Sequence, residues 1–574
     1  MMRIGCLAFL IGLFSVAAAR GQEPQLSSIF PPGGQRGTTI EITFEGKDLK
    51  AVRTLFFSHA EITAKKVAEN KFAVTIPETI AEADYDVWAV TATGLSNPRR
   101  LVVGSLPEVN EKEKNDDPAT AQEVKLPIVI NGKLEPGTDR DYYRFEASAG
   151  QQLTIHFRSE TLDGSARPAL TLFGPTGKEL LHDDGRDAEP MLQFEAPAAG
   201  SYLLKVEERA YQKGDNVYRL AIFSGPSLVA SYPQLLTRGK TQSVTLYGYR
   251  LPGGKAAGPD APLGLQQIQA DVKVPPTGDP DGGGWTLANA IGLDAFSYRR
   301  PAIYGQLRFG LADGDVTIAP ERATTQADAQ PITLPSWIAG RFLRPRQVDW
   351  YRLNLKKGDS LWLEAAGERD GKVMDLEIVI HDAKGKVLKT ISDVVLGKGQ
   401  KSFFPIETFD PMDTWTATAD GQIFLVVRDL YGTTRWGVTR TYRLHVGKNT
   451  ESFRVAALAA GTVPRGFAVP AGGTVTIPLI AQRRGGHQSP IRVRIQGLPP
   501  GLEAQEVVIA KDQPTANMTL TATKDVSSWV GRLTLTAETE IAGKSATFPV
   551  IGLTMVRPTI VRRCELVAAV LGKP

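Results

Sequence analysis

The stretch QQLTIHF, residues 151–157, decides the fold class of this chain. Its apolar Leu153, Ile155 and Phe157 alternate with polar neighbours, and an alternation with period two is typical of a β-strand that buries one face. The same pattern recurs in GSYLLKV (200–206). Turn sequences rich in Gly and Pro separate such short runs, as they do in β-sandwiches. The sequence therefore predicts an all-β fold of tandem β-sandwich modules.

Two internal repeats show how these modules are organised. PQLSSIFPPGGQRGTTIEITFEGKDL (24–49) matches PSLVASYPQLLTRGKTQSVTLYGYRL (226–251), and NGKLEPGTDRDYYRF (131–145) matches AGRFLRPRQVDWYRL (339–353). Both matches have nearly the same spacing along the chain, so a two-module unit is duplicated. A further module follows from about residue 453.

Length and charge limit the possible functions. A chain of 574 residues is too long for one hydrophobic core, because domains usually span roughly 100 to 200 residues. We therefore expect several domains arranged like beads on a string. The net charge is only +4, which indicates no polyanion-binding surface, and we expect no nucleic-acid partner.

The first residues are typical of a secretory signal. Arg3 precedes the apolar run IGCLAFLIGLFSVAAA (4–19), and cleavage after Ala19 or Gly21 fits the small-residue rule. The alternative, a membrane anchor, needs about 20 apolar residues. We therefore expect residues 1–21 to be removed and the protein to be secreted, periplasmic or attached to the cell surface. No later segment is long and apolar enough to span a membrane.

Removal of the signal leaves Cys564 as the only cysteine of the mature chain. No internal disulfide can then form, so the modules must be held by ordinary cores or by metal ions. Cys564 lies between two arginines and an apolar tail, and we interpret it as incidental.

Three motifs give residues 108–224 a family resemblance. EKEKND (111–116), DRDYYRF (139–145) and YRLAI (218–222) resemble the pattern of the bacterial pre-peptidase C-terminal (PPC) domain. The resemblance implies a jelly-roll-like β-sandwich that serves as an accessory or substrate-binding module, usually behind the catalytic domain of a secreted peptidase. No catalytic domain precedes it here, which weakens an inference of proteolysis.

The other modules follow from the repeats. Residues 331–448 resemble a degenerate second PPC copy that keeps VDWYRL and TYRL but lacks the acidic segment. The first and last modules resemble immunoglobulin-like domains, the first of the IPT/TIG type. The expected domains are a signal peptide (1–21), an IPT/TIG-like domain (24–105), a PPC domain (108–224), a second immunoglobulin-like domain (226–328), a degenerate PPC-like domain (331–448), a C-terminal immunoglobulin-like domain (453–557) and a tail (558–574). Within the second immunoglobulin-like domain, the Gly- and Pro-rich residues 251–285 are interpreted as a long loop.

An acidic segment, EKEKNDD (111–117), is the strongest candidate site. In an extended strand Glu111, Glu113 and Asn115 would share one face, and a turn would bring Asp116 to the same point. In DDPATAQEV, Asp117 can cap a short helix. The alternative is a solvated linker with this helix cap, as runs of charge usually are.

Asp139 and Asp141, two residues apart on a predicted strand, would complete the cluster. Calcium suits such a set, because it takes six to eight oxygen ligands with tolerant geometry. The resemblance implies the same, since some PPC-type domains carry calcium here. The predicted calcium ligands are Glu111, Glu113, Asn115, Asp116, Asp139 and Asp141. In the second copy Gln347 replaces Asp139 and only Asp349 remains, so we expect no calcium there.

No motif of a known enzyme class is present. The chain has no HExxH, no GxSxG and no glycine-rich phosphate loop, and we expect a non-catalytic protein. Trp415 and Trp436 lie in segments interpreted as loops and are the candidates for a binding surface. We expect a protein that binds an extracellular polysaccharide or a partner protein, such as a secreted peptidase or an envelope component. The alternatives are an accessory subunit of a secreted hydrolase and a structural surface spacer.

Overall fold

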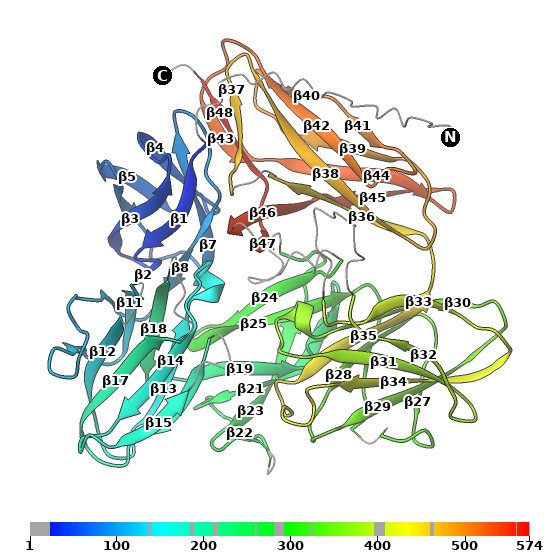
Figure 1. Ribbon diagram of the computed structural model, residues 1–574, viewed down its shortest axis with the longest axis horizontal. Helices are drawn as coiled ribbons and strands as arrows, with labels where there is room; N and C mark the ends of the chain where they lie inside the picture. Colours follow the sequence, from blue (N-terminus) through cyan, green and yellow to red (C-terminus); the bar gives the residue numbers. More distant parts are fainter. Residues whose placement is uncertain are drawn as a thin grey trace, which may run out of the picture.

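A computed structural model describes residues 23–135, 139–183, 189–209, 216–258, 261–279, 292–321, 324–394, 408–459, 464–557 and 560–572. Within these residues the regular elements are β-strands and two 3-10 helices, η1 (Glu160–Leu162) and η3 (Glu368–Asp370). The predicted all-β fold class is confirmed. No described helix has the length and hydropathy to cross a bilayer. The predicted signal peptide lies outside the described residues. The strands form five modules, which succeed one another along the colour bar of Figure 1.

Module 1 comprises strands β1 to β8 in two four-stranded sheets. The first sheet has the order β1 (Gln25–Phe30), β3 (Thr39–Lys47), β6 (Lys71–Thr75), β5 (Thr63–Ala68). The second has the order β2 (Gly33–Gln35), β8 (Arg99–Gly104), β7 (Ala83–Thr91), β4 (Val52–Phe57). Phe44, Phe72 and Leu101 are buried between them.

Module 2 comprises β9 to β18 in two five-stranded sheets. The first has the order β10 (Gln122–Glu123), β12 (Arg140–Ala147), β17 (Gly200–Glu208), β14 (Pro168–Phe173), β15 (Glu179–Asp183). The second has the order β16 (Met191–Glu195), β13 (Gln152–Arg158), β18 (Val217–Phe223), β11 (Ile128–Lys133), β9 (Glu108–Asn110). Leu153, Ile155 and Phe157 all point into the core of this module, as their alternation predicts.

Module 4 repeats this topology strand for strand. One sheet has the order β27 (Gln330–Pro331), β29 (Val348–Leu355), β34 (Gly421–Asp429), β31 (Leu376–Asp382), β32 (Val387–Ile391). The other has the order β33 (Met412–Thr416), β30 (Ser360–Ala366), β35 (Thr441–Lys448), β28 (Ser336–Arg341), β26 (Val316–Ile318). The predicted boundary at 328–331 is wrong, because β26 pairs with β28 of this module. Three residues of edge strand are too short to show a periodic pattern.

Module 3 comprises β19 to β25, which form one seven-stranded sheet with the order β20, β25, β19, β21, β23, β22 and with β24 paired to β25 outside that order. The strands are β19 (Ser227–Tyr232), β20 (Leu235–Thr237), β21 (Thr241–Tyr249), β22 (Lys255–Ala256), β23 (Gln266–Lys273), β24 (Ala295–Arg300) and β25 (Ile303–Ala312). The prediction of one long loop over 251–285 is wrong where it is described, because β23 pairs along β21. The Gly and Pro residues around β23 masked its alternation. Residues 280–291 lie outside the described residues.

Module 5 comprises β36 to β48 in three sheets. The largest has the order β40 (Leu502–Ala504), β42 (Thr515–Ala522), β38 (Thr474–Arg484), β36 (Ser452–Leu458), β46 (Ile551–Arg557), β47 (Ile560–Arg563). The other two have the orders β37 (Phe467–Pro470), β48 (Val567–Leu571), β43 (Trp529–Arg532) and β41 (Val507–Ile509), β39 (Ile491–Gln496), β44 (Thr534–Ile541), β45 (Lys544–Pro549).

The expectation of a tail over 558–574 is wrong. Strand β48 lies between β37 and β43, and its residues Val567 to Val570 are buried. Cys564 is buried as well, and the apolar surroundings raise the pKa of its thiol. The C-terminal apolar run therefore completes module 5, because only pairing with two strands satisfies its backbone groups out of water.

The five modules close on one another instead of forming beads on a string. Figure 1 shows the orange and red strands of module 5 beside the blue strands of module 1. Trp88 and Leu95 of module 1 pack against Val567 and Ala569 of module 5. Arg562 of module 5 donates to Asp86 of module 1 (2.6 Å) and to Asp163 of module 2 (2.9 Å).

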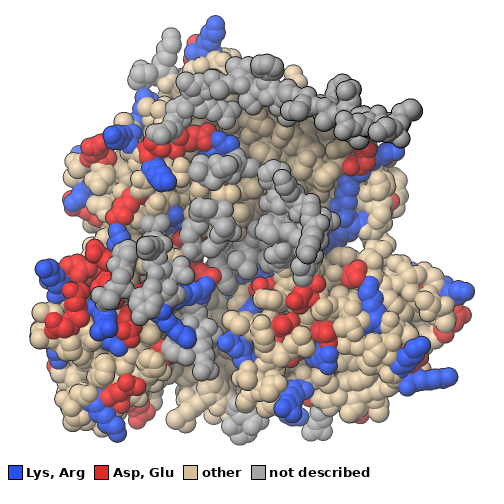
Figure 2. All heavy atoms as spheres, viewed as in Figure 1, with Lys and Arg blue, Asp and Glu red and all other residues tan. Residues whose placement is uncertain are grey.

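Ion pairs also join other modules at their interfaces. Asp84 of module 1 accepts from Arg158 of module 2 (2.6 Å) and lies 3.8 Å from Arg299 of module 3. Arg484 of module 5 lies 3.2 Å from Glu364 of module 4. Figure 2 shows acidic and basic side chains interspersed over one face of the molecule, in keeping with the small net charge.

Candidate functional site

The predicted acidic cluster lies at one end of module 2, where β9, β11 and β12 meet. Strand β9 ends at Asn110, and residues 111–117 form no strand. The expected extended strand over this segment is therefore wrong. The Gln122 side chain accepts from the Lys112 amide (2.7 Å) and donates to the Asn110 carbonyl (3.1 Å), which bends the segment away from the sheet. Asp117 caps a turn, not a helix, by accepting from the Ala119 amide (2.8 Å).

Three of the predicted ligands meet despite this difference. One carboxylate oxygen each of Glu111, Glu113 and Asp141 lies within 4.8 Å of the other two. Glu111 is held by the Lys133 amide, which donates to its Oε2 (2.8 Å). Asp141 is fully buried, and its Oδ2 accepts from the Tyr218 hydroxyl (2.6 Å). These carboxylates lie close together without a counter-charge from a described side chain at hydrogen-bond distance.

Asn115 completes the buried part of the cluster. Its side chain is fully buried, and its carbonyl accepts from the Tyr142 amide (2.9 Å). The Asn115 side chain lies beside Asp141 and Tyr143, but neither of its polar atoms forms a well-aligned hydrogen bond with a described residue, and neither does Oδ1 of Asp141. Buried polar atoms without partners are costly, so a cation that binds the Asn115 and Asp141 oxygens would stabilise this site.

The pKa values of these acids also reflect the lack of a positive partner in the cluster. Burial, and after it the charge of the neighbouring Asp141, raise the pKa of Glu111 to about 9. Burial likewise raises the pKa of Asp141 to about 8, against the effect of the Tyr218 hydrogen bond. A carboxylate that is hard to ionise beside other acids is one whose charge a cation would stabilise.

Asp116 and Asp139 lie at the rim of the cluster. The charge of Asp116 raises the pKa of both Glu113 and Asp139, after the larger contribution of burial. Asp139 Oδ2 accepts from the Glu135 amide (2.5 Å). The structure thus brings Glu111, Glu113, Asn115 and Asp141 together and leaves two predicted ligands at the edge.

In the second copy an amide side chain donates to the buried aspartate, a partner that the first copy lacks. Gln347, at the position of Asp139, donates from Nε2 to Asp349 Oδ1 (2.9 Å), and Tyr442 donates to Asp349 Oδ2 (2.5 Å). Both carboxylate oxygens of Asp349 are therefore satisfied by protein groups. At the position of Glu111 the second copy has Ala319, which is buried in the core.

Both copies share a tyrosine pair behind this aspartate. The hydroxyls of Tyr143 and Tyr218 are hydrogen-bonded in module 2, and those of Tyr351 and Tyr442 are hydrogen-bonded in module 4 (2.7 Å). A Cβ atom on Gly132 or Gly340 would overlap the ring of Tyr218 or Tyr442. The glycine that the two copies have in common is therefore needed for the ring to reach the aspartate.

Residues 139–208 match the family profile of the bacterial pre-peptidase C-terminal domain. The chain contains a PPC domain. No curated protein sequence matches this chain. Among solved structures, the PPC domain of a collagenase from Bacillus anthracis is 23% identical, covers 19% of this chain and 99% of its own, and has a TM-score of 0.16. The SGBP-B protein of a Bacteroides ovatus mixed-linkage glucan utilization locus, in complex with a heptasaccharide, is 11% identical, covers 74% of each chain and has a TM-score of 0.14.

The donor set of the PPC domain fits calcium. Three carboxylates and one amide offer oxygen atoms, and neither His nor Cys belongs to the group, whereas zinc would favour those residues. Glu111, Glu113, Asp141 and the Asn115 amide oxygen are the groups that would hold the ion. A bound divalent cation would neutralise the mutual repulsion of these acids.

The two predicted tryptophans lie in different environments. Trp415 is part of β33, pairs with Leu361, and packs partly buried against the core of module 4. Its expected position on a loop is wrong, because five residues of β33 pair along β30. Trp436 lies in the connection between β34 and β35 and keeps 44% of its surface exposed.

Trp436 also lines a large cavity, which no sequence pattern predicted. The cavity has a volume of about 970 Å³ and is bounded by modules 1 to 4. Asp84, Arg158, Arg299 and Lys372 contribute charged side chains to its wall. These residues are far apart in the chain and belong to different modules, so no local motif could link them.

Proposed function

We propose that this protein is an exported, non-catalytic binding protein. Calcium stabilises its PPC domain, and several modules jointly form a binding surface for an extracellular polymer or partner protein. The observation that carries the binding role is the cavity of about 970 Å³ with the exposed Trp436 on its wall. Specific ligand sites are concave, partly aromatic and lined by a few fixed polar groups. The signal-like N-terminus supports export.

Calcium has a structural role in this proposal. The ion would bind Glu111, Glu113, Asp141 and the Asn115 amide oxygen, all next to strands of the PPC domain. At a calcium concentration about ten times the dissociation constant, binding stabilises the folded state by on the order of 1 kcal/mol. The cluster lies at the start of module 2, so this energy would fix the segment that follows module 1.

The calcium role is tested by titration of the full-length mature chain. We expect a single heat of calcium binding by isothermal titration calorimetry and a higher midpoint of thermal unfolding with calcium than with a chelator. Asp141→Asn should remove both. The matched change in the second copy, Asp349→Asn, should leave both in place. An unchanged calcium response in the Asp141 variant would contradict the assignment.

The binding role is tested by retention of the same chain on insoluble polysaccharides and on immobilised envelope proteins. Trp436→Ala should reduce retention, whereas Trp415→Ala should act only through stability, because that ring packs on the core. Co-purification with a secreted hydrolase in place of polymer retention would favour an accessory subunit. Retention by neither would leave a structural spacer.

A further inference from the structure

One wall of the central cavity carries a lysine that forms no ion pair with a described residue. Lys372 follows η3 in module 4 and lines the cavity. No acceptor for its ammonium group lies within hydrogen-bond distance among the described residues. Burial, with smaller contributions from repulsion by Arg440 and Arg308, lowers the pKa of Lys372 to about 8. A partly buried ammonium in this position would be stabilised by an anion.

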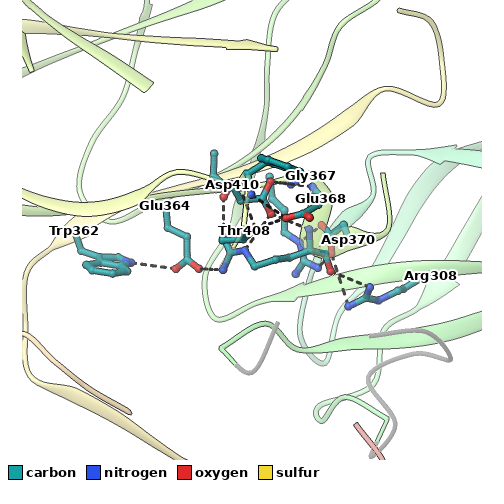
Figure 3. Close-up of polar contacts among 12 residues, drawn as sticks. Arg308, Trp362, Glu364, Gly367, Glu368, Asp370, Thr408 and Asp410 are labelled. Carbon is teal, nitrogen blue, oxygen red and sulfur yellow. Dashed lines mark hydrogen bonds and ion pairs between the residues drawn. The ribbon is translucent and has the colours of Figure 1, made fainter. Parts of the chain in front are cut away.

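The two neighbouring arginines are occupied elsewhere. Arg308 Nη2 lies 3.8 Å from Asp370 Oδ1, and Figure 3 shows this pair beside the buried Glu364 and Asp410. Arg440 Nη1 donates to the Val373 carbonyl (2.7 Å). Asp370 also pairs with Arg443 of its own module. The acid closest in sequence to Lys372 is therefore already shared between two guanidinium groups.

An aromatic ring lies on the same side of the cavity. Trp436 directly precedes the turn from Gly437 to Arg440, and the Arg440 bond to the Val373 carbonyl joins this turn to the Lys372 loop. Trp436 and Val438 both line the cavity. An exposed indole offers a flat apolar face on which a sugar ring can stack, and a nearby cation can bind the acid group of that sugar.

We propose that the module 4 side of the cavity, around Lys372 and Trp436, binds a carboxylate-bearing sugar of an acidic polysaccharide. This inference rests on the proposed binding function and names its ligand class. The ammonium would pair with the carboxylate and the indole would stack on the ring. The volume of about 970 Å³ lies at the upper end of ligand pockets, so it suits several linked rings better than a single inorganic ion.

The test is the binding of a trigalacturonate to the full-length chain at a constant calcium concentration, measured by isothermal titration calorimetry. Lys372→Met should weaken binding by about tenfold to a hundredfold, because a hydrogen bond to a charged group is lost. Lys372→Arg should restore most of it, and Trp436→Ala should weaken it by about tenfold. Lys384→Ala, on an exposed turn, is the control. Circular dichroism and unfolding midpoints identify any variant that fails to fold.

Three comparison probes decide between sources of the anionic group. The methyl-esterified trisaccharide, which keeps the rings and loses the charge, should bind at least about tenfold more weakly. Sulfate alone and a tri-glutamate peptide should not compete at equal concentration. Equal binding of the ester, the peptide or sulfate would overturn the inference, as would no binding of trigalacturonate. If polymer is retained on the column but Lys372→Met changes nothing, the inference fails and the proposed function stands.

Discussion

Modules 2 and 4 have the same strand order and the same buried aspartate, yet they satisfy that aspartate differently. In module 4 the Gln347 amide and the Tyr442 hydroxyl bond both oxygens of Asp349. In module 2 one oxygen of Asp141 faces Glu111 and Glu113 and has no partner among the described residues. The comparison teaches that one scaffold can be completed either by its own amide or by a cation. Burial raises the pKa of Asp349 only to about 6, since the Tyr442 and Gln347 hydrogen bonds oppose the rise, whereas burial and the neighbouring acids raise the pKa of Asp141 to about 8.

The largest expected effect concerns what the two copies share. Gly132→Ala and Gly340→Ala should each destabilise the protein by about 1 to 3 kcal/mol or more, because the new methyl group overlaps a buried tyrosine ring. Chemical denaturation measures this change. Gly225→Ala is the control, since its Cβ would find its nearest described atom 3.6 Å away. A neutral result at Gly340 alone would show that the second copy does not need the tyrosine contact.

A second prediction concerns the residue that each copy turns toward the next module. His156 of β13 contacts the Tyr304 hydroxyl of module 3 (2.9 Å), and Glu364 of β30 pairs with Arg484 of module 5. Burial, with a smaller contribution from the charge of Arg158, lowers the pKa of His156 to about 3. The unfolded histidine binds a proton below about pH 6.5, and the folded one does not. Stability from this group is therefore present above pH 6.5 and is lost as the pH falls toward 3.

At pH 5 the loss at His156 should amount to about 2 kcal/mol relative to pH 7. The measurement is the free energy of unfolding at both pH values for the native protein and for His156→Gln. Glutamine does not titrate, so the variant should lose less stability between the two. Identical slopes for both proteins would mean that His156 does not carry this pH dependence.

A third prediction concerns exchanging, between the two copies, the residue at the position of Asp139 and Gln347. Asp139→Gln places an amide where module 4 has Gln347, beside Asp141 and within reach of the Glu135 amide that Asp139 already binds. We expect the calcium-free protein to gain about 1 kcal/mol of stability and the calcium-induced rise in the unfolding midpoint to shrink. Thermal unfolding with calcium and with a chelator measures both.

The reverse exchange is its control. Gln347→Asp should destabilise module 4 by about 1 kcal/mol, since Asp349 loses a donor, and should create no calcium response because Ala319 stands at the position of Glu111. A new calcium response in this variant would mean that one aspartate is enough, and the importance assigned to Glu111 would then be wrong.

Sequence reasoning succeeded where the signal was local. The alternation in QQLTIHF predicted three core positions, and the acids of 111–116 and 139–141 predicted a cluster of which four members meet. It failed where a segment showed no alternation of apolar and polar residues. Strand β26 is only three residues long, and β23 lies among Gly and Pro residues. Residues 111–117 leave the sheet where hydrogen bonds to the Gln122 side chain take the place of backbone hydrogen bonds between strands.

The amino-acid sequence by itself determined the β class, the duplication and the presence of oxygen donors at one point of module 2, because each depends on neighbours in the chain. Tertiary structure alone decided that Arg562 joins modules 1 and 2 to module 5, that the C-terminal run is a buried strand, and that Trp436 and Lys372 share a cavity. Such contacts use outward-facing side chains, which follow no period, and they form only when separate modules pack together.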